Sequence, residues 1–193
     1  MAHTTMLAHQ QFDITPVRNA TDLADTITLF HAYAASLGFD LAFQNFSVEM
    51  AGMPGKYSPE AGGELLIARD VASGKAIGCA GLRSLTSLPS TLAGGSSNLR
   101  RCCEMKRLYV TPEGRGSGVG KALVSQIINV AEDLGYAEVR LDTLPQMVAA
   151  RNMYRAIGFL EIDAYYETPM EGTHFLCLKL PRAKGMSVSA ANG

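Results

Sequence analysis

Apolar and polar residues along the chain follow two different periods, one typical of strands and one typical of helices. Residues 12–17 (FDITPV) alternate with a period of two, the pattern of a strand with one buried face. Other apolar runs bounded by glycine, proline and further turn residues have the same interpretation. Strands are predicted at residues 12–17, 64–70, 76–85, 103–110, 138–144, 159–166 and 174–180.

Four stretches have the helical period instead. From Thr21 the apolar residues recur every three to four positions as far as Leu37, so Thr21 is the expected N-cap and Gly38 the expected stop. The clearest helix follows residue 120 and ends at Gly135, a residue type common just after a helix. Two shorter helices are predicted at residues 44–52 and 147–157.

The resulting order, βααβββαβαββ, indicates an α/β (α+β) protein with a mixed sheet and helices on its faces. Segments 53–63 and 88–98 are rich in glycine, proline and serine and are interpreted as loops. One domain over residues 11–180 accounts for all the elements, since 193 residues suit a single core. Residues 1–10 are expected to be a flexible N-terminus and 181–193 a disordered tail.

Composition narrows the class of function. The chain is 47% hydrophobic and 18% charged with a net charge of -1, which argues against nucleic acid or a membrane as partner. It has no run of about 18 apolar residues and no signal-peptide pattern in its first residues. The cysteines form no CxxC pair, so we expect neither a metal site nor a disulfide framework, and we interpret the protein as cytoplasmic.

The segment PEGRGSGVGKAL (112–123) has four glycines and two cations. It lies between a predicted strand and a predicted helix, where unpaired N–H groups and the helix dipole favour a phosphate. A Walker A loop would need glycine at Arg115 and a hydroxyl at Ala122, and a dinucleotide fingerprint finds no third glycine. Between Arg100 and Lys121 six cations accompany two acids, which also favours an anionic small molecule.

A third pattern, R-x-x-G-x-G, is present in full at Arg115, Gly118 and Gly120. It resembles motif A of the GNAT superfamily, the acetyl-CoA-dependent N-acetyltransferases. The segment AARNMYRAIGF (149–159) resembles motif B of the same superfamily, A-x-x-L-Y-x-x-x-G-F, with Tyr154 at the tyrosine. The segment KRLYVTPEGRGSGVG is further similar to a bacterial small-molecule branch.

The resemblance implies a fold and a cofactor. It implies a mostly antiparallel sheet of about seven strands, in which a splayed pair of strands holds coenzyme A, and it implies no metal. The N–H groups of the loop would wrap the pyrophosphate, and the end of the preceding strand would hold the pantetheine arm. The implied cofactor-binding residues are Leu108, Tyr109, Val110, Arg115, Gly116, Ser117, Gly118, Val119, Gly120, Lys121 and Tyr154.

Catalytic roles are implied as well. Tyr154 would be the general acid for the leaving thiolate, a role that suits a phenol protonated at neutral pH. Glu104 would be the general base, directly or through water, because an alkylammonium must lose a proton before it attacks. An N–H near Val110 would polarise the thioester carbonyl. The implied reaction is direct acetyl transfer, in a ternary complex, to a primary amine of a small-molecule or amino-acid-like acceptor.

Alternatives stay open for each role. The glycines could merely start a helix, Tyr154 could be a core aromatic, and Glu104 could pair with Lys106 or Arg101. Met147 stands where many family members have an asparagine that contacts the coenzyme arm. An alternative function is that of a protein that binds acyl-CoA without turning it over. An alternative mechanism uses Cys102 or Cys103 as a covalent acyl carrier.

The acceptor cannot be identified from the sequence. In the family it is set by the first helices and a late loop between strands. The candidate residues in these regions are Tyr33, Phe39, Tyr57, Tyr165, Tyr166, Glu167 and His174. A homodimer is a further implication of the resemblance.

Overall fold

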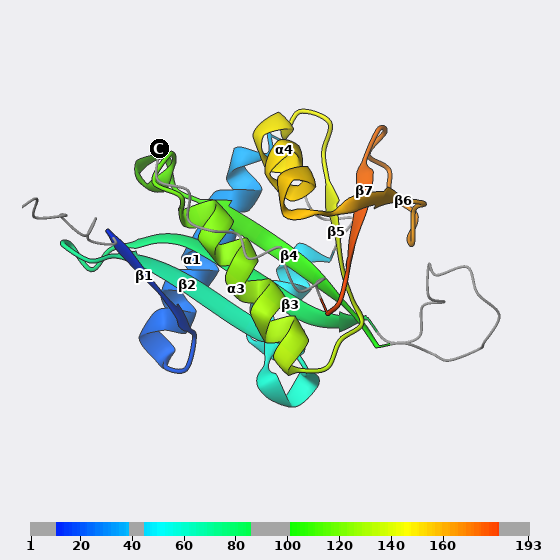
Figure 1. The fold of residues 1–193 in the computed structure, drawn as a ribbon. Coiled ribbons are helices and arrows are strands. Elements are labelled where there is room, and N and C mark those ends of the chain that lie inside the picture. The colour runs from blue at the N-terminus through cyan, green and yellow to red at the C-terminus, as the bar shows by residue number, and fades with distance from the viewer. Residues whose placement is uncertain (1–10, 39–44, 86–100, 182–193) are drawn as a thin grey trace, which may run out of the picture.

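A seven-stranded sheet forms the centre of the computed structural model, which describes residues 11–38, 45–85 and 101–181 (Figure 1). The strands are β1 (Phe12–Pro16), β2 (Glu64–Asp70), β3 (Ala76–Leu85), β4 (Cys102–Val110), β5 (Glu138–Thr143), β6 (Leu160–Ile162) and β7 (His174–Lys179). Their order in the sheet is β1-β2-β3-β4-β5-β7-β6, and only β4 and β5 are parallel neighbours. The expectation of a mixed, mostly antiparallel sheet is confirmed.

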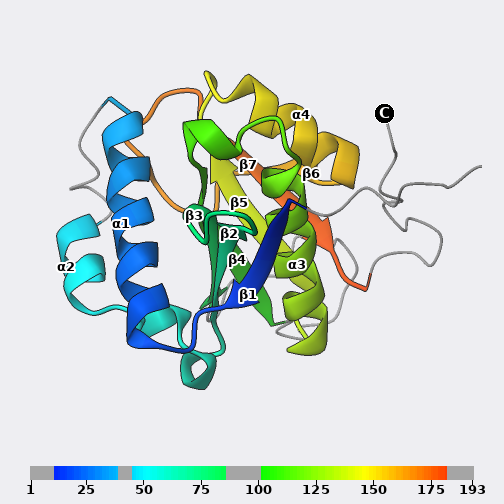
Figure 2. The same ribbon diagram turned by 90° about the vertical axis from the view of Figure 1, so that its left-hand side faces the viewer.

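Helices cover both faces of the sheet, as the sequence predicts (Figure 2). The α-helices of the described residues are α1 (Ala20–Ser36), α2 (Phe46–Ala51), α3 (Val119–Asp133) and α4 (Val148–Ile157). α1 and α2 lie on one face, and α3 and α4 lie on the other. Within the described ranges, no helix has the length and apolar character needed to cross a membrane.

Alternation along the strands divides the apolar residues between two cores. On β2, Leu66 and Ala68 belong to the core that includes α3, whereas Leu65 and Ile67 belong to the core that includes α1. The α3 core is the larger. The fully buried face that α3 contributes to it consists of Val119, Leu123, Val124, Ile127, Ile128 and Ala131.

β4 and β5 are paired only where they begin. The pairing joins residues 102–104 of β4 to residues 138–140 of β5. Beyond this point β4 continues to Val110 and β5 to Thr143, but their register is no longer matched. A gap therefore opens between two neighbouring strands near their carboxyl ends. The splayed strand pair lies where the resemblance implied it.

A bulge on β4 lies beside this gap. The register with β3 changes from Cys79–Tyr109 to Gly81–Lys106, so β4 carries one extra residue there. Within the bulge Arg107 has a φ of 58°, a left-handed conformation that is unfavourable for a residue with a side chain. Bulges of this kind redirect the backbone and are common next to active sites.

The start of α1 differs from the prediction. Its N-cap is Asn19, not Thr21, because the Asn19 side chain accepts a hydrogen bond from the Asp22 N–H at 2.9 Å. Asn19 Nδ2 also donates to Asp22 Oδ2 at 2.7 Å, so the two side chains stabilise each other at the helix start. The predicted stop is correct, since Gly38 follows the helix with a φ of 75°.

The predicted strand at 159–166 is shorter than expected, and β6 ends at Ile162. Tyr165 and Tyr166 lie beyond it and pack edge to face on each other and on Phe175, with ring centroids 5.1 to 5.3 Å apart. Their apolar pattern therefore reflects an aromatic cluster. The predicted loop at 53–63 contains two short 3₁₀ turns, η2 (Gly55–Tyr57) and η3 (Pro59–Ala61). The predicted N-terminus at 1–10, all but the first residue of the predicted tail at 181–193, and the loop at 88–98 lie outside the described residues.

Replacing Asn19 with alanine should lower the free energy of unfolding by about 1 kcal/mol, because the Asp22 N–H loses its cap. Thr21→Ala is the matched control, since Thr21 is exposed and should change stability by less than about 0.5 kcal/mol. Urea denaturation of both variants measures the difference. A larger loss for Thr21→Ala would contradict the assignment of the cap.

Candidate functional site between the splayed strands

The glycines of the loop between β4 and α3 have different tasks. Gly114, the last residue of the short turn η4 (Pro112–Gly114), is buried, and a Cβ there would lie 3.0 Å from Cγ1 of Val110. Gly116 and Gly118 have φ values of 79° and 87°, in the region that favours glycine. A Cβ at either position would meet no atom within 4 Å. The backbone at these two glycines therefore borders open space.

α3 starts at this open loop without a side-chain cap. Its N-cap is Gly118, and the Gly118 carbonyl accepts the Ala122 N–H at 3.0 Å. The N–H groups of Val119, Gly120 and Lys121 come before that bond and have no carbonyl of an earlier helical turn to bind. Together with the positive end of the helix dipole, they form a site that favours an anion. The open space at the glycines gives such an anion room to approach.

Side chains of the loop fix its shape. Ser117 Oγ donates to the Gly114 carbonyl at 2.7 Å, and Thr111 Oγ1 accepts from the Gly114 N–H at 3.4 Å. Arg115 Nε donates to the Val110 carbonyl at 3.3 Å and so ties the loop to the end of β4. The loop is therefore held by its own side chains.

The end of β4 directs polar backbone groups away from β3. The Thr111 N–H donates to the Ile77 carbonyl at 2.9 Å, so these two residues form a hydrogen-bonded pair. The two kinds of pair alternate along an antiparallel ladder, so the adjacent pair of Val110 and Gly78 is not hydrogen-bonded. The N–H of Val110 consequently faces the gap between β4 and β5.

A cleft occupies this gap. It is lined by residues of α1, β4, β5, α4 and the turn before α4: Tyr33, Met105, Lys106, Arg107, Leu108, Leu141, Asp142, Thr143, Met147, Ala150 and Tyr154. At Gly120, a Cβ would lie 3.5 Å from Val110 Cγ2 and 4.0 Å from Met153 Sδ. The end of β4, the start of α3 and helix α4 thus meet beside the cleft. The two sequence motifs are brought together there.

Tyr154 is buried and lines the cleft, and its hydroxyl has no hydrogen-bond partner among the described residues. Burial, followed by the nearby Tyr33 and Asp142, raises the pKa of Tyr154 above that of an ordinary tyrosine. The phenol is therefore protonated at neutral pH and has a proton to donate.

Two residues of motif B hold the Tyr154 ring. Gly158 has a φ of 109° and ends α4, which lets the chain turn back at once. The Phe159 N–H then donates to the Tyr154 carbonyl at 3.0 Å, and the two rings pack edge to face at 5.6 Å. The spacing of tyrosine, glycine and phenylalanine therefore has a direct structural reason.

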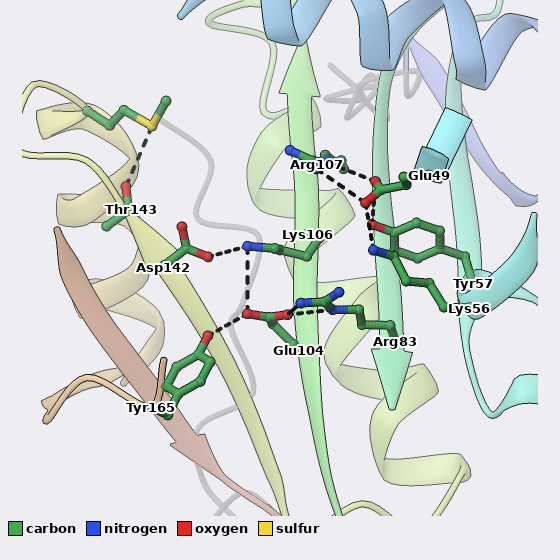
Figure 3. Close-up of polar contacts among 11 residues, drawn as sticks. Glu49, Lys56, Tyr57, Arg83, Glu104, Lys106, Arg107, Asp142, Thr143 and Tyr165 are labelled. Atoms are coloured by element: carbon green, nitrogen blue, oxygen red, sulfur yellow. Dashed lines mark hydrogen bonds and ion pairs between the residues drawn. The ribbon is translucent and has the colours of Figure 1, made fainter. Parts of the chain in front are cut away.

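Glu104 is fully buried, with 0% of its side chain exposed, and has three polar partners (Figure 3). Arg83 donates to Oε2 from Nε at 2.6 Å and from Nη2 at 2.5 Å. The Tyr165 hydroxyl donates to Oε1 at 2.7 Å, and Lys106 Nζ lies 3.7 Å from the same oxygen. The pairing with Lys106 that the sequence left open is present. Arg101 donates elsewhere, to a backbone carbonyl.

Lys106 bridges the gap between the strands. From β4 its Nζ donates to Asp142 Oδ1 on β5 at 2.6 Å (Figure 3). It also lies 5.5 Å from the centre of the Tyr166 ring. Glu104 and Asp142 thus lie on two sides of one ammonium group. Of the two carboxylates, Asp142 lines the cleft, with 16% of its side chain exposed.

Glu49, on α2, holds the bulge of β4. Arg107 donates to the Glu49 carboxylate from Nε at 2.9 Å and from Nη2 at 3.3 Å. Lys56 Nζ also donates to it at 2.6 Å, and the Tyr57 hydroxyl donates at 2.9 Å. Burial opposes the charge of Glu49, but the two cations outweigh it and lower its pKa to about 2. The unfavourable backbone of Arg107 is therefore held by a buried ion pair.

A second pocket lies beside the cleft. Its lining consists of Glu49, Lys56, Arg83, Lys106, Arg107, Tyr166 and Glu167. Lys106 and Arg107 belong to the lining of both spaces, so the pocket and the cleft adjoin.

The residues predicted for acceptor recognition have different positions. Those that line the cleft or the second pocket are Tyr33, Tyr166 and Glu167. Tyr57 and Tyr165 instead donate to the buried carboxylates. His174 lies at the start of β7 with Nδ1 3.2 Å from Glu161, and Phe39 lies outside the described residues.

Sequence reasoning did not assign a role to several charged residues around the cleft. These are Glu49, Arg83, Arg107 and Asp142, and Lys106 entered only as a partner for Glu104. Most lie inside predicted strands, where charged residues are seldom buried without a partner. A charged residue inside a predicted strand therefore indicates a buried ion pair, but the sequence does not identify the partner.

The cysteines do not fit a covalent acyl carrier. Cys102 and Cys103 are buried on β4, and neither lines the cleft. Burial raises the pKa of both thiols, which makes them poor nucleophiles.

Comparisons with known proteins agree with this geometry. The chain matches the profile of the acetyltransferase (GNAT) family over residues 33–159. An uncharacterized N-acetyltransferase of Schizosaccharomyces pombe is 36% identical over 177 residues, which cover 92% of this chain and 100% of the relative.

Solved structures share the fold. A GNAT phosphinothricin acetyltransferase of Sinorhizobium meliloti in complex with acetyl-CoA has a TM-score of 0.59 and 19% identity, and the match covers 88% of each chain. A chain of the NatC complex bound to Gag peptide and CoA has a TM-score of 0.63 and 23% identity, over 89% of this chain and 99% of that one. At such identities the likeness concerns the fold alone.

Proposed function

This chain belongs to the GNAT acetyltransferase family, and we propose that it transfers an acetyl group from acetyl-CoA to the primary amine of a small, amino-acid-like acceptor. Acetyl-CoA supplies an acyl thioester, whose carbonyl carbon an amine attacks. The observation that carries the proposal is the arrangement along one gap of the open glycine loop, the Val110 N–H and the Tyr154 hydroxyl.

The glycine loop fits the pyrophosphate of the donor. The N–H groups from Gly116 to Lys121 include the uncapped start of α3, and the loop borders open space at two glycines. Arg115 and Lys121 are exposed cations at the same end of the helix. Leu108, Tyr109 and Val110 at the end of β4 would hold the arm that leads to the thioester.

Two groups of the chain would act on the reacting thioester. The Val110 N–H is the donor for the acyl oxygen, on which negative charge develops. The Tyr154 hydroxyl, which is protonated and has no partner among the described residues, donates a proton to the departing sulfur. Neither group has to give up an existing hydrogen bond in the described structure.

The amine proton needs an acceptor, and the carboxylates joined by Lys106 supply it. Glu104, the base that the resemblance implies, is fully buried, so it would act through a neighbour or a water. Asp142 lines the cleft and can touch the acceptor amine. We assign proton removal to this pair, with Asp142 as the member in contact.

Direct transfer in a ternary complex is the mechanism we infer, and the raised pKa values of the buried thiols of Cys102 and Cys103 support it over a covalent acyl carrier. The non-catalytic alternative is a sensor that binds acyl-CoA through the loop alone. A peptide amine is the competing acceptor class, since the NatC neighbour was solved with a Gag peptide. The homodimer and the cytoplasmic location remain predictions.

Replacing Tyr154 with phenylalanine should lower kcat by about 10²–10⁴-fold, because it removes the proton donor. The affinity for acetyl-CoA and the melting temperature should stay unchanged, since the hydroxyl has no partner among the described residues. Thiol release with a panel of amines and calorimetry with acetyl-CoA measure these effects.

Tyr136→Phe is the matched control. Its hydroxyl donates to the Gly62 carbonyl at 2.6 Å and lies outside the cleft lining, so this variant should lose stability and keep kcat. Wild-type kcat in Tyr154→Phe would refute the acid role. Binding of acetyl-CoA without turnover of any amine would favour the sensor.

Asp142→Asn and Glu104→Gln should have different effects. Asp142→Asn should lower kcat by about 10²–10⁴-fold, because it removes the base at the cleft, and it should destabilise the fold less than Glu104→Gln, because Lys106 keeps Glu104 as a neighbour and no arginine loses its partner. Glu104→Gln should also lower the free energy of unfolding by about 3–5 kcal/mol, because Arg83 and Lys106 lose a buried partner. Steady-state kinetics and urea denaturation separate the two. Full activity in Asp142→Asn together with an inactive, stable Glu104→Gln would assign the base to Glu104 alone.

A further inference from the structure

The second pocket offers a site for one end of the acceptor. It adjoins the cleft through Lys106 and Arg107, which line both spaces. It is bounded by the segment of Lys56, by β3 at Arg83 and by the loop that carries Tyr166 and Glu167. A molecule that extends from this pocket past Lys106 would therefore enter the space in which Tyr154 and Asp142 lie.

Charge in this region is unbalanced. Its cations are Lys56, Arg83, Lys106 and Arg107, which makes four, and the carboxylates they contact are Glu49, Glu104 and Asp142, which makes three. These groups together leave one positive charge over, on a cluster in which Lys106 and Arg107 are largely buried and Lys56 and Arg83 are partly exposed. Glu167 also borders the pocket, but it is exposed to solvent, where its charge is screened.

The cations and the acids are also arranged differently. Lys56 and Arg83 keep 38% and 26% of their side chains exposed, whereas their partners Glu49 and Glu104 keep 4% and 0%. The acids are thus more deeply buried than the cations, although Glu49 also belongs to the pocket lining. Arg83 uses Nε and Nη2 for Glu104, and a guanidinium has further N–H donors.

Lys56 lies beside Glu49 but also near two further cations. Burial lowers its pKa, and although Glu49 opposes this effect, Arg83 and Arg107 add to it. An anion in the pocket would relieve this repulsion. A carboxylate suits the site because a guanidinium and an ammonium can both donate to its two oxygens.

We propose that the second pocket binds a carboxylate of the acceptor, so that the favoured substrates are amines that also carry a carboxylate, such as amino acids. This inference rests on the proposed acetyl transfer and adds the chemical class of the acceptor. The carboxylate lies between Lys56 and Arg83, and the amine at the other end of the molecule reaches Asp142 in the cleft. A peptide N-terminus, whose neighbouring carbonyl is an amide, lacks the group that this pocket binds.

The test compares acceptors in pairs. The free amino acids and several ω-amino acids are assayed with acetyl-CoA, each beside its carboxamide, which keeps the amine and removes the negative charge. For the best acceptor we expect the carboxamide to have a KM about tenfold higher, the effect of one charge-assisted hydrogen bond. The preference should also decrease as salt is added.

The variant Lys56→Gln should remove this preference. Its kcat/KM for the carboxylate acceptor should fall about tenfold, while that for the carboxamide should change less than about twofold. Amidation also changes the pKa of the amine, but that effect is the same in both enzymes and cancels in the comparison. Lys75→Gln is the matched control, because Lys75 is an exposed lysine of the β2–β3 turn outside the pocket. It should behave as the wild type.

The outcomes separate the two proposals. Amines acetylated equally well with and without a carboxylate would overturn the inference and leave the acetyl transfer intact. Faster acetylation of peptide N-termini than of free amino acids would do the same. Absence of turnover with every amine would instead count against the proposed function. If Lys56→Gln does not fold, the paired acceptors and their salt dependence still decide the question with the wild-type protein.

Discussion

The separation of β4 from β5 is the constraint on which the candidate site depends. The two strands pair over residues 102–104 and 138–140 and then part. A continuous sheet would bury the backbone groups of Val110 and fill the space that Tyr154 borders. Because the strands part, a cleft forms inside the sheet, with a helix starting after each strand. The bulge at Arg107 lies beside this cleft, and the Lys106–Asp142 bridge joins its two strands.

Charged side chains, more than apolar packing, form the walls of the second pocket. Glu104 and Glu49 are taken out of water, and this cost is offset only because each receives several donors. Such groups add little net stability compared with apolar residues, but they fix positions sharply, since moving one partner leaves a buried charge unpaired. A fixed set of cations, whose partner acids are more deeply buried, is suited to recognising an anionic group at a defined place.

The sequence predicted those features that depend on local chemistry. The positions of Gly116, Gly118 and Gly158 could be predicted, because left-handed turns favour glycine and the motif spacing marks where they fall. Tyr154 could be placed because its spacing to Phe159 is set within one helix and its end. The contacts of Arg83 with Glu104 and of Lys106 with Asp142 join residues 21 and 36 positions apart, and only the order of strands in the sheet brings them together. Asn19 was missed as the cap because Asn19 and Thr21 are both good cap residues, and the pair with Asp22 decides between them.

The most direct test is a calorimetric titration of acetyl-CoA into the wild type, Gly118→Ala and Gly74→Ala. Both glycines have positive φ, 87° and 71°, and at both a Cβ would meet no atom within 4 Å, so the backbone strain of the two substitutions is comparable. Only Gly118 borders the start of α3. We expect the wild type and Gly74→Ala to bind equally and Gly118→Ala to bind at least about tenfold more weakly, because its methyl group occupies the anion's approach. Equal binding by all three proteins, or no binding by the wild type, would contradict the account.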